Sequence, residues 1–388
     1  MVSMKERKYD VAIIGAGVIG CSLAYYLTTR GINNVVLIEK EEFPGTGSTS
    51  KANGGIRAQF TTEPHVQMSL LSMRLLEEMD EEMQSQARYV KAGYLFVTAR
   101  SENFKKLKEL VQFQQRLGVA VELLDKSQIE AGYTYLRTDD LVGGSYGKQD
   151  GFIDPGGLTY AYYSRALARG VQFLANTRAT GLLFKENRVY GVKTDKGDVL
   201  AELIVNAAGP YAAVVANWAN VSLPLEPVKR NIGVTGPTPD FPNPIPMTID
   251  LDTGLVIRRE GEGCSMAWAD PDEPPGFNLQ FDPNFIEKIA PKMEKRFPKL
   301  MEAGINFSKC WAGLYPETPD HHAILGESGV SGFLLATGLG GHGVMHAPAV
   351  GFTLSEFIAT GQSTTLDLAP FTLQRFKTGK LNIERAVL

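Results

Sequence analysis

The chain has 388 residues, of which 44% are hydrophobic and 21% are charged, and its formal net charge is −4. This length exceeds one ordinary hydrophobic core, so we expect two packed domains. The charge balance lacks the basic excess that nucleic-acid binding requires, and no apolar stretch reaches the ~20 residues of a membrane span. The three cysteines have no zinc or disulfide spacing, which favours a reducing compartment, and we expect the cytoplasm.

The N-terminal part of the chain predicts a strand, a helix and a second strand. Residues 9–14 and 35–39 are short apolar runs, and residues 18–30 form a helical pattern that ends at Gly31. Strand, helix and strand in this order form a right-handed β-α-β unit with parallel strands. A basic start followed by an apolar stretch also outlines a secretory signal. Cleavage of that signal would remove the glycine motif described below, so we favour the β-α-β interpretation.

The rest of the chain alternates between helical and strand patterns. Residues 178–205 contain short strands separated by turns, which predicts a β-meander. A strand, a glycine turn and a helix follow over residues 332–360. The remaining patterns predict strands over residues 93–98, 253–258 and 264–268, and helices over residues 63–83, 103–117, 158–169 and 282–297.

A dinucleotide-binding fingerprint lies between the first strand and its helix. The motif is Gly15-x-Gly17-x-x-Gly20, and Glu39 ends the next strand about 20 residues further on. Gly15 allows the tight turn, Gly17 lets the backbone approach the pyrophosphate, and Gly20 lets the helix lie close to the sheet. Glu39 is expected to accept hydrogen bonds from the adenosine ribose. The motif alone does not choose between NAD and FAD.

Three further segments carry a resemblance to a known family. Residues 47–59 are rich in small side chains, residues 311–320 read WAGLYPETPD, and residues 338–351 read GLGGHGVMHAPAVG. Together with the fingerprint, they resemble the D-amino-acid-oxidase-like superfamily of FAD enzymes. The pattern is most similar to the β-subunit group of heterotetrameric sarcosine oxidase and dye-linked L-proline dehydrogenase, with glycine oxidase a more distant relative. This resemblance spans residues 9–351 and argues against an NAD-dependent dehydrogenase.

The resemblance, taken with the fingerprint, implies a set of residues around FAD. The glycine turn before residue 344 would supply N–H groups and a helix dipole near the flavin. The expected cofactor-binding residues are Gly15, Gly17, Val18, Ile19, Gly20, Glu39, Lys40, Ser48, Thr49, Ala52, Asn53, Gly54, Ala179, Ala208, Gly209, Gly338, Leu339, Gly340, Gly341, His342, Gly343, Val344 and Met345. No metal site is expected.

Four positions of this sequence differ from residues that related enzymes use, and these differences restrict the expected cofactor linkage and reaction. Gly313 matches the cysteine that carries flavin in monomeric sarcosine oxidases, so FAD is expected to be non-covalent. Tyr315 stands where glycine oxidase uses an arginine for the substrate carboxylate, and Met345 stands where monomeric sarcosine oxidases have a lysine. Ser265 matches their oxygen-activating lysine, which favours a dehydrogenase that passes electrons to a dye, a quinone or a partner subunit.

Arg57, His342 and Tyr315 are the candidate catalytic residues. Arg57 lies next to a glycine pair in the flavin-facing segment and is expected to bind the substrate carboxylate; the alternative is a structural pair with Glu63. His342 invites a general-base role, although packing against the flavin is the simpler interpretation, with His346 filling a helix interface. Tyr94 and Trp268 are interpreted as core residues, although an amine pocket also favours aromatic walls.

The sequence therefore predicts an α/β protein with two domains. A discontinuous Rossmann-type FAD-binding domain covers residues 1–85, 148–225 and 310–388, and a substrate domain dominated by antiparallel sheet covers residues 86–147 and 226–309. The expected reaction oxidises the C–N bond of a small secondary amino or imino acid by hydride transfer to flavin N5, giving an imine. The alternatives are a 2-hydroxy-acid oxidase or dehydrogenase and a non-catalytic flavin electron-transfer subunit. An electron-accepting partner subunit or a homo-oligomer is compatible with each.

Overall fold

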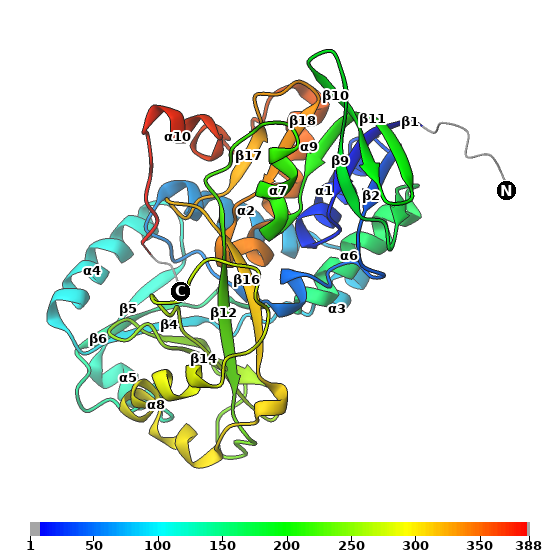
Figure 1. The fold of residues 1–388 in the computed structure, drawn as a ribbon. Helices are drawn as coiled ribbons and strands as arrows, with labels where there is room; N and C mark the ends of the chain where they lie inside the picture. The colour runs from blue at the N-terminus through cyan, green and yellow to red at the C-terminus, as the bar shows by residue number, and fades with distance from the viewer. Residues whose placement is uncertain (1–7, 386–388) are drawn as a thin grey trace.

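The computed structural model describes residues 8–385, which fold around two large sheets (Figure 1). In the first sheet the strand order is β17-β18-β11-β1-β2-β8. β1 (Lys8–Ile14) pairs in parallel with β2 (Val35–Ile38) on one side and with β11 (Gly197–Asn206) on the other. α1 (Val18–Thr29) connects β1 to β2. The predicted β-α-β unit is therefore present, at the centre of the first sheet.

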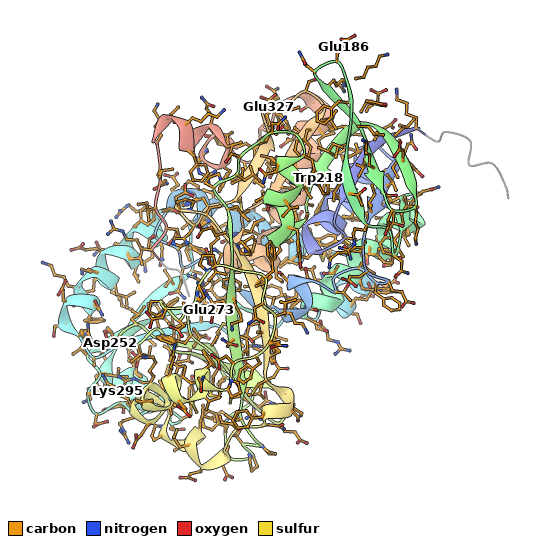
Figure 2. All side chains as sticks on the ribbon, viewed as in Figure 1. Glu186, Trp218, Asp252, Glu273, Lys295 and Glu327 are labelled. Carbon is orange, nitrogen blue, oxygen red and sulfur yellow. The ribbon has the colours of Figure 1, made fainter. Side chains whose placement is uncertain are left out.

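The predicted β-meander is also present. β9 (Ala179–Lys185) and β10 (Arg188–Thr194) lead antiparallel into β11. Glu186 lies at the tip of the β9–β10 hairpin with a φ of 54°, in the left-handed region that such a turn needs (Figure 2). The first sheet is completed by β8 (Gln172–Leu174), which is parallel to β2, β18 (Phe333–Thr337), which is parallel to β11, and β17 (Ile324–Glu327), which is antiparallel to β18.

Helices cover the first sheet, and their apolar side chains form a hydrophobic core with it. α1 packs against α9 (Gly343–Thr360) so closely that a Cβ at Gly351 would overlap Ser22. Ser22 Oγ donates a hydrogen bond to Ala347 O at 2.7 Å. α6 (Pro155–Ala168) and α2 (Glu63–Glu77) bury their apolar faces in the same core. Shorter helices are α7 (Ala212–Asn217) and α10 (Gln374–Thr378).

The second sheet lies in the other half of the molecule (Figure 1). Its strand order is β16-β12-β15-β14-β13-β4-β6-β5, and only the β13–β4 pair is parallel. α8 (Asn284–Arg296) packs its apolar face into a separate core on this sheet, and α4 (Ser101–Arg116) and α5 (Lys126–Gly132) also lie against it. The strands are β4 (Tyr94–Thr98), β5 (Val121–Asp125), β6 (Gly143–Gly147), β12 (Glu226–Val234), β13 (Met247–Asp250), β14 (Val256–Glu260), β15 (Gly263–Ala267) and β16 (Trp311–Glu317).

The structure differs from the sequence prediction at two places. The single helix expected over residues 63–83 is split into α2 and α3 (Glu81–Ala87), because Asp80 accepts a hydrogen bond from Met83 N at 3.0 Å and caps a new helix. β16, expected within the FAD-binding domain, pairs with β12 and so belongs to the second sheet. The polypeptide therefore crosses between the two sheets at β16.

Candidate active site

A large cavity of about 630 Å³ opens where β1, β2, β11 and β18 end. Trp218, labelled in Figure 2, is one of its lining residues. The carboxyl edge of a parallel sheet is the usual ligand site of such folds. The predicted cofactor-binding residues that line this cavity are Gly15, Gly17, Val18, Ile19, Glu39, Lys40, Ser48, Thr49, Ala52, Ala179, Ala208, Gly209, Gly338, Leu339, Gly340, Gly341, Gly343 and Val344.

The fingerprint glycines have the geometry that their motif predicts. Gly15 has a φ of +104°, and a Cβ there would lie 2.5 Å from Ala207 O. A Cβ at Gly20 would overlap Gly15 O, so glycine is needed at position 20 for α1 to approach the preceding turn this closely. Gly20 itself lines neither cavity. Gly17 lines the large cavity, and a Cβ placed there would contact only Thr49 Oγ1. The N-terminus of α1 therefore opens onto the cavity, as phosphate binding requires.

Glu39 ties the fingerprint loop to the end of β2. Its Oε2 accepts a hydrogen bond from Ala16 N at 2.9 Å, and its Oε1 accepts one from Glu41 N at 3.1 Å. An ionised carboxylate has about four acceptor positions, so two remain for ligand hydroxyls. The residues at this end of the cavity thus fit the adenosine ribose of a dinucleotide.

The other end of the large cavity is built by η1 (Ser48–Lys51) and η5 (Gly340–His342), two short 3-10 helices. Ser48 Oγ donates a hydrogen bond to Leu314 O at 2.8 Å, which fixes η1 against β16. A Cβ at Gly341 would lie 2.5 Å from the ring of Tyr315, so only glycine fits this approach. The glycine turn and the start of α9 form an open cradle that a flat ring system would fill.

No cysteine is positioned for a covalent bond to a ligand in this cavity. A Cβ at Gly313 would lie 2.7 Å from Lys51 Cβ, so position 313 has no room for a side chain. Cys310 is half-buried, and its Sγ accepts a hydrogen bond from Val234 N at 3.3 Å. None of the three cysteines lines either cavity.

We therefore expect acid precipitation of the purified holoprotein to release all of its flavin into the supernatant. The reason is that a covalent link needs a nucleophilic side chain, and the family position for that side chain is Gly313. Flavin fluorescence that stays with the denatured polypeptide in a gel would contradict this prediction.

A small second cavity of about 70 Å³ adjoins the first, and Ala52, Tyr315, Gly341 and Val344 line both. Four residues expected at the cofactor line this small cavity instead: Asn53, Gly54, His342 and Met345. Tyr94 and Trp268 also line it. Tyr94 is at the same time a buried member of a core cluster, so the core interpretation is confirmed for this residue, and both side chains form aromatic walls of the small cavity.

Arg57 reaches the small cavity from the segment after β3 (Gly55–Ile56), which pairs with β7 (Gly151–Phe152). Its side chain is buried, and Nη1 donates a hydrogen bond to Gln59 O at 2.5 Å. The guanidinium lies 4.0 Å from the centre of the Phe60 ring. Burial lowers the pKa of Arg57, and Tyr94, Glu384 and Asp150 oppose that shift. Glu63, the alternative partner, is exposed at the start of α2.

A buried carboxylate fixes the backbone beside Arg57. Asp150 accepts hydrogen bonds from Ala58 N and from Gln59 Nε2, both at 2.9 Å. Ser145 Oγ in turn donates to Gln59 Oε1 at 2.8 Å. Burial raises the pKa of Asp150 to about 7. The carbonyl that holds Arg57 is therefore anchored from the second sheet.

Four of the five histidines lie buried in one cluster with Phe60. His65 and His322 stack with ring centres 4.0 Å apart, and His346 Nε2 lies 2.9 Å from Ser69 Oγ between α2 and α9. His342 lines the small cavity, and its Nδ1 is buried without a hydrogen-bond partner among residues 8–385. Burial lowers the pKa of each of these four histidines, that of His322 to about 4.

This cluster predicts a loss of stability in mild acid. In the unfolded chain a histidine titrates near a pKa of about 6.5, so below that value the unfolded state binds more protons and is favoured. The raised pKa values of Asp150 and His321 act in the opposite direction, but they are two groups against four. The melting temperature should therefore fall as pH is lowered from 7 to 4.5, and His346→Gln should make that fall shallower. A flat wild-type profile would contradict the assignment.

The fold and the large cavity define a dinucleotide-binding protein with a smaller cavity beside the dinucleotide site. Residues 10–357 match the DAO family, described as FAD dependent oxidoreductase. The chain therefore belongs to the DAO family of FAD-dependent oxidoreductases, and its cofactor is FAD.

Comparisons with individual proteins agree with this family assignment. FAD-dependent oxidoreductase domain-containing protein 1 of Xenopus laevis is 31% identical, with 99% of this chain and 86% of the relative covered. Human mitochondrial sarcosine dehydrogenase is 28% identical, and the match covers 95% of this chain but 41% of that relative. The crystal structure of L-proline dehydrogenase from P. horikoshii superimposes with a TM-score of 0.89 at 28% identity, covering 97% of this chain and 100% of that chain. The resemblance seen in the sequence is confirmed at the level of the family.

No helix within residues 8–385 is long and apolar enough to cross a membrane. Across the same range, no group of three or more histidine, cysteine, aspartate or glutamate side chains could hold a metal ion.

Proposed function

We propose that the protein oxidises the C–N bond of a small secondary amino or imino acid of the sarcosine or proline kind to an imine. The observation that carries this proposal is the small cavity beside the FAD cavity. It presents arginine side chains and aromatic walls, and no carboxylate is among the described residues that line it. Such a chamber suits a small anion with an apolar body.

The proposed roles of the residues follow from their contacts. Bound FAD supplies the two-electron chemistry. Arg57 would hold the substrate carboxylate and so fix the neighbouring carbon. Tyr94 and Tyr315, both buried at their hydroxyl ends, would exclude water from the reacting carbon. His342 stays neutral because burial lowers its pKa well below the ordinary value, so it adds no cation beside the amine.

Anaerobic reduction tests this proposal. The oxidised holoenzyme is mixed with N-methyl and cyclic amino acids, with the matching primary amino acids and with 2-hydroxy acids, and flavin absorbance is followed. We expect bleaching by one or more secondary amino acids. Bleaching by 2-hydroxy acids alone would instead support a hydroxy-acid enzyme, and bleaching by none would support an electron-transfer subunit.

We also propose that the electrons pass to a dye, a quinone or a partner protein rather than rapidly to oxygen, in a cytoplasmic enzyme. Ser265 is buried on β15 and donates a hydrogen bond to Asn53 Oδ1 at 3.1 Å. This serine supplies no positive charge to stabilise superoxide. Turnover with an artificial dye should exceed peroxide formation in air, and equal rates would overturn the proposal.

A further inference from the structure

Arg230 is a second arginine at the small cavity, and it comes from a different part of the fold. It lies on β12, where its backbone is opposite Gly313 of β16. Its guanidinium carbon lies 5.3 Å from the centre of the Tyr315 ring. Arg57 reaches the same cavity from the flavin-facing segment after β3. The small cavity is thus lined by two arginines, one from the segment after β3 and one from β12 of the second sheet.

The donors of Arg230 are incompletely used. Nη1 donates to Lys229 O at 3.1 Å, and Nη2 lies 3.6 Å from Glu317 Oε1, beyond ordinary hydrogen-bond distance. Nε of Arg230 and Oε1 of Glu317 are both buried without a hydrogen-bond partner among residues 8–385. Arg230 lines the small cavity, and this loose pairing leaves N–H donors of its guanidinium available for an acceptor supplied by a ligand.

An orphan donor alone would not identify a binding residue. Arg259 on β14 also has a buried Nε without a partner in the described part of the chain, but its Nη1 donates to Thr238 Oγ1 at 2.6 Å and it lines neither cavity. Lys229, the neighbour of Arg230 on β12, pairs with Glu273 at 3.2 Å; Glu273 is labelled in Figure 2. Arg230 differs from both in facing the small cavity.

We propose that Arg230 is a substrate-binding residue that, with Arg57, holds a single carboxylate between two guanidinium groups. This inference rests on the proposed function and narrows it. The two guanidinium groups border one small cavity, whose other lining side chains are aromatic, apolar or uncharged, so a single carboxylate can be bound by both. The substrate class is therefore a small amino or imino acid whose carboxylate is held by both arginines.

The test uses the FAD-loaded enzyme and acetate as a probe of the carboxylate site. Acetate binding is followed by the change in flavin absorbance and by calorimetry, and turnover is measured with the best monocarboxylic substrate. Arg230→Gln should raise both the acetate Kd and the substrate KM by roughly 30-fold or more, with a much smaller change in kcat. Arg230→Lys should lie between wild type and Arg230→Gln, because it keeps the charge but loses the planar fork.

Two control variants distinguish a role of Arg230 in ligand binding from a structural role. Arg259→Gln removes a half-buried arginine of the second sheet that lines neither cavity, and this variant should bind acetate like the wild type. Glu317→Gln should also retain acetate binding; if it mimics Arg230→Gln, Arg230 is only a partner of Glu317 and the inference fails. Wild-type acetate affinity in Arg230→Gln would likewise overturn it.

Failure of the inference is distinguishable from failure of the proposed function. Acetate binding that depends on Arg230, in an enzyme that no amino acid reduces, would support the anion site and overturn the amine reaction. Flavin reduction by an amino acid, with acetate binding and KM unaffected in Arg230→Gln, would support the reaction and overturn the role of Arg230.

Discussion

Glu39→Arg is expected to yield a protein purified almost free of FAD. The wild-type carboxylate accepts hydrogen bonds from Ala16 N and Glu41 N and borders the large cavity. Arginine offers no acceptor, so both backbone donors and the ribose hydroxyls lose their partner. At about 1.5–3 kcal/mol for each hydrogen bond to a charged group, two lost bonds weaken FAD binding by roughly a hundred- to ten-thousand-fold.

The measurement is the ratio of flavin to protein after purification, followed by titration of the apoprotein with FAD. Glu42→Arg is the matched control, because Glu42 is exposed three residues further along and lines neither cavity. Glu39→Gln should keep part of the affinity, because its amide oxygen still accepts. A Glu39→Arg protein with full FAD content would show that Glu39 is not the ribose partner.

The nucleotide end of the site was predictable because its signals are local. Strand, glycine turn, helix and strand occupy 31 consecutive residues from Lys8 to Ile38 in the structure, and hydrophobic periodicity and glycine spacing report such short-range order directly. The meander before β11 has the same local character. The break between α2 and α3 was missed because the acidic run around Asp80 continues the helical pattern, and only the cap reveals the break.

The substrate end of the site was less predictable because long-range pairing decides it. β16 lies within the family motif at residues 311–320, which was expected in the FAD-binding domain, yet its partner β12 lies far away along the chain. Along β12 successive side chains point to opposite faces, so the sequence shows two adjacent cations, Lys229 and Arg230, without saying which faces the cavity. The lining of the small cavity, which includes Arg230 but not Lys229, resolves this. For Tyr94 the sequence predicts a core position, and only its neighbours in three dimensions show that it also borders the small cavity.

Arg57→Ala is expected to keep the fold and FAD while losing roughly 30- to several-thousand-fold in kcat/KM on amines that carry a carboxylate. Such a loss corresponds to about 2–5 kcal/mol for removal of a buried charged partner. Arg57 lines the small cavity, and its contacts within the protein include Gln59 O, the Phe60 ring and the Phe96 ring of β4. Because its guanidinium borders the cavity, its removal should lower the rate for a substrate that carries a carboxylate more than for one that lacks it.

The decisive comparison for Arg57 is between a substrate and its decarboxylated analogue, such as proline and pyrrolidine. A carboxylate ligand predicts that Arg57→Ala lowers the rate of flavin reduction by proline much more than that by pyrrolidine, and that Arg57→Lys restores part of the difference. FAD content and melting temperature, measured first, identify damage to the loop that Asp150 anchors. Equal losses on both compounds would make Arg57 a structural residue, because removing a loop support affects every substrate alike. Arg230, the other arginine that lines the small cavity, would then be the residue expected to bind the substrate carboxylate.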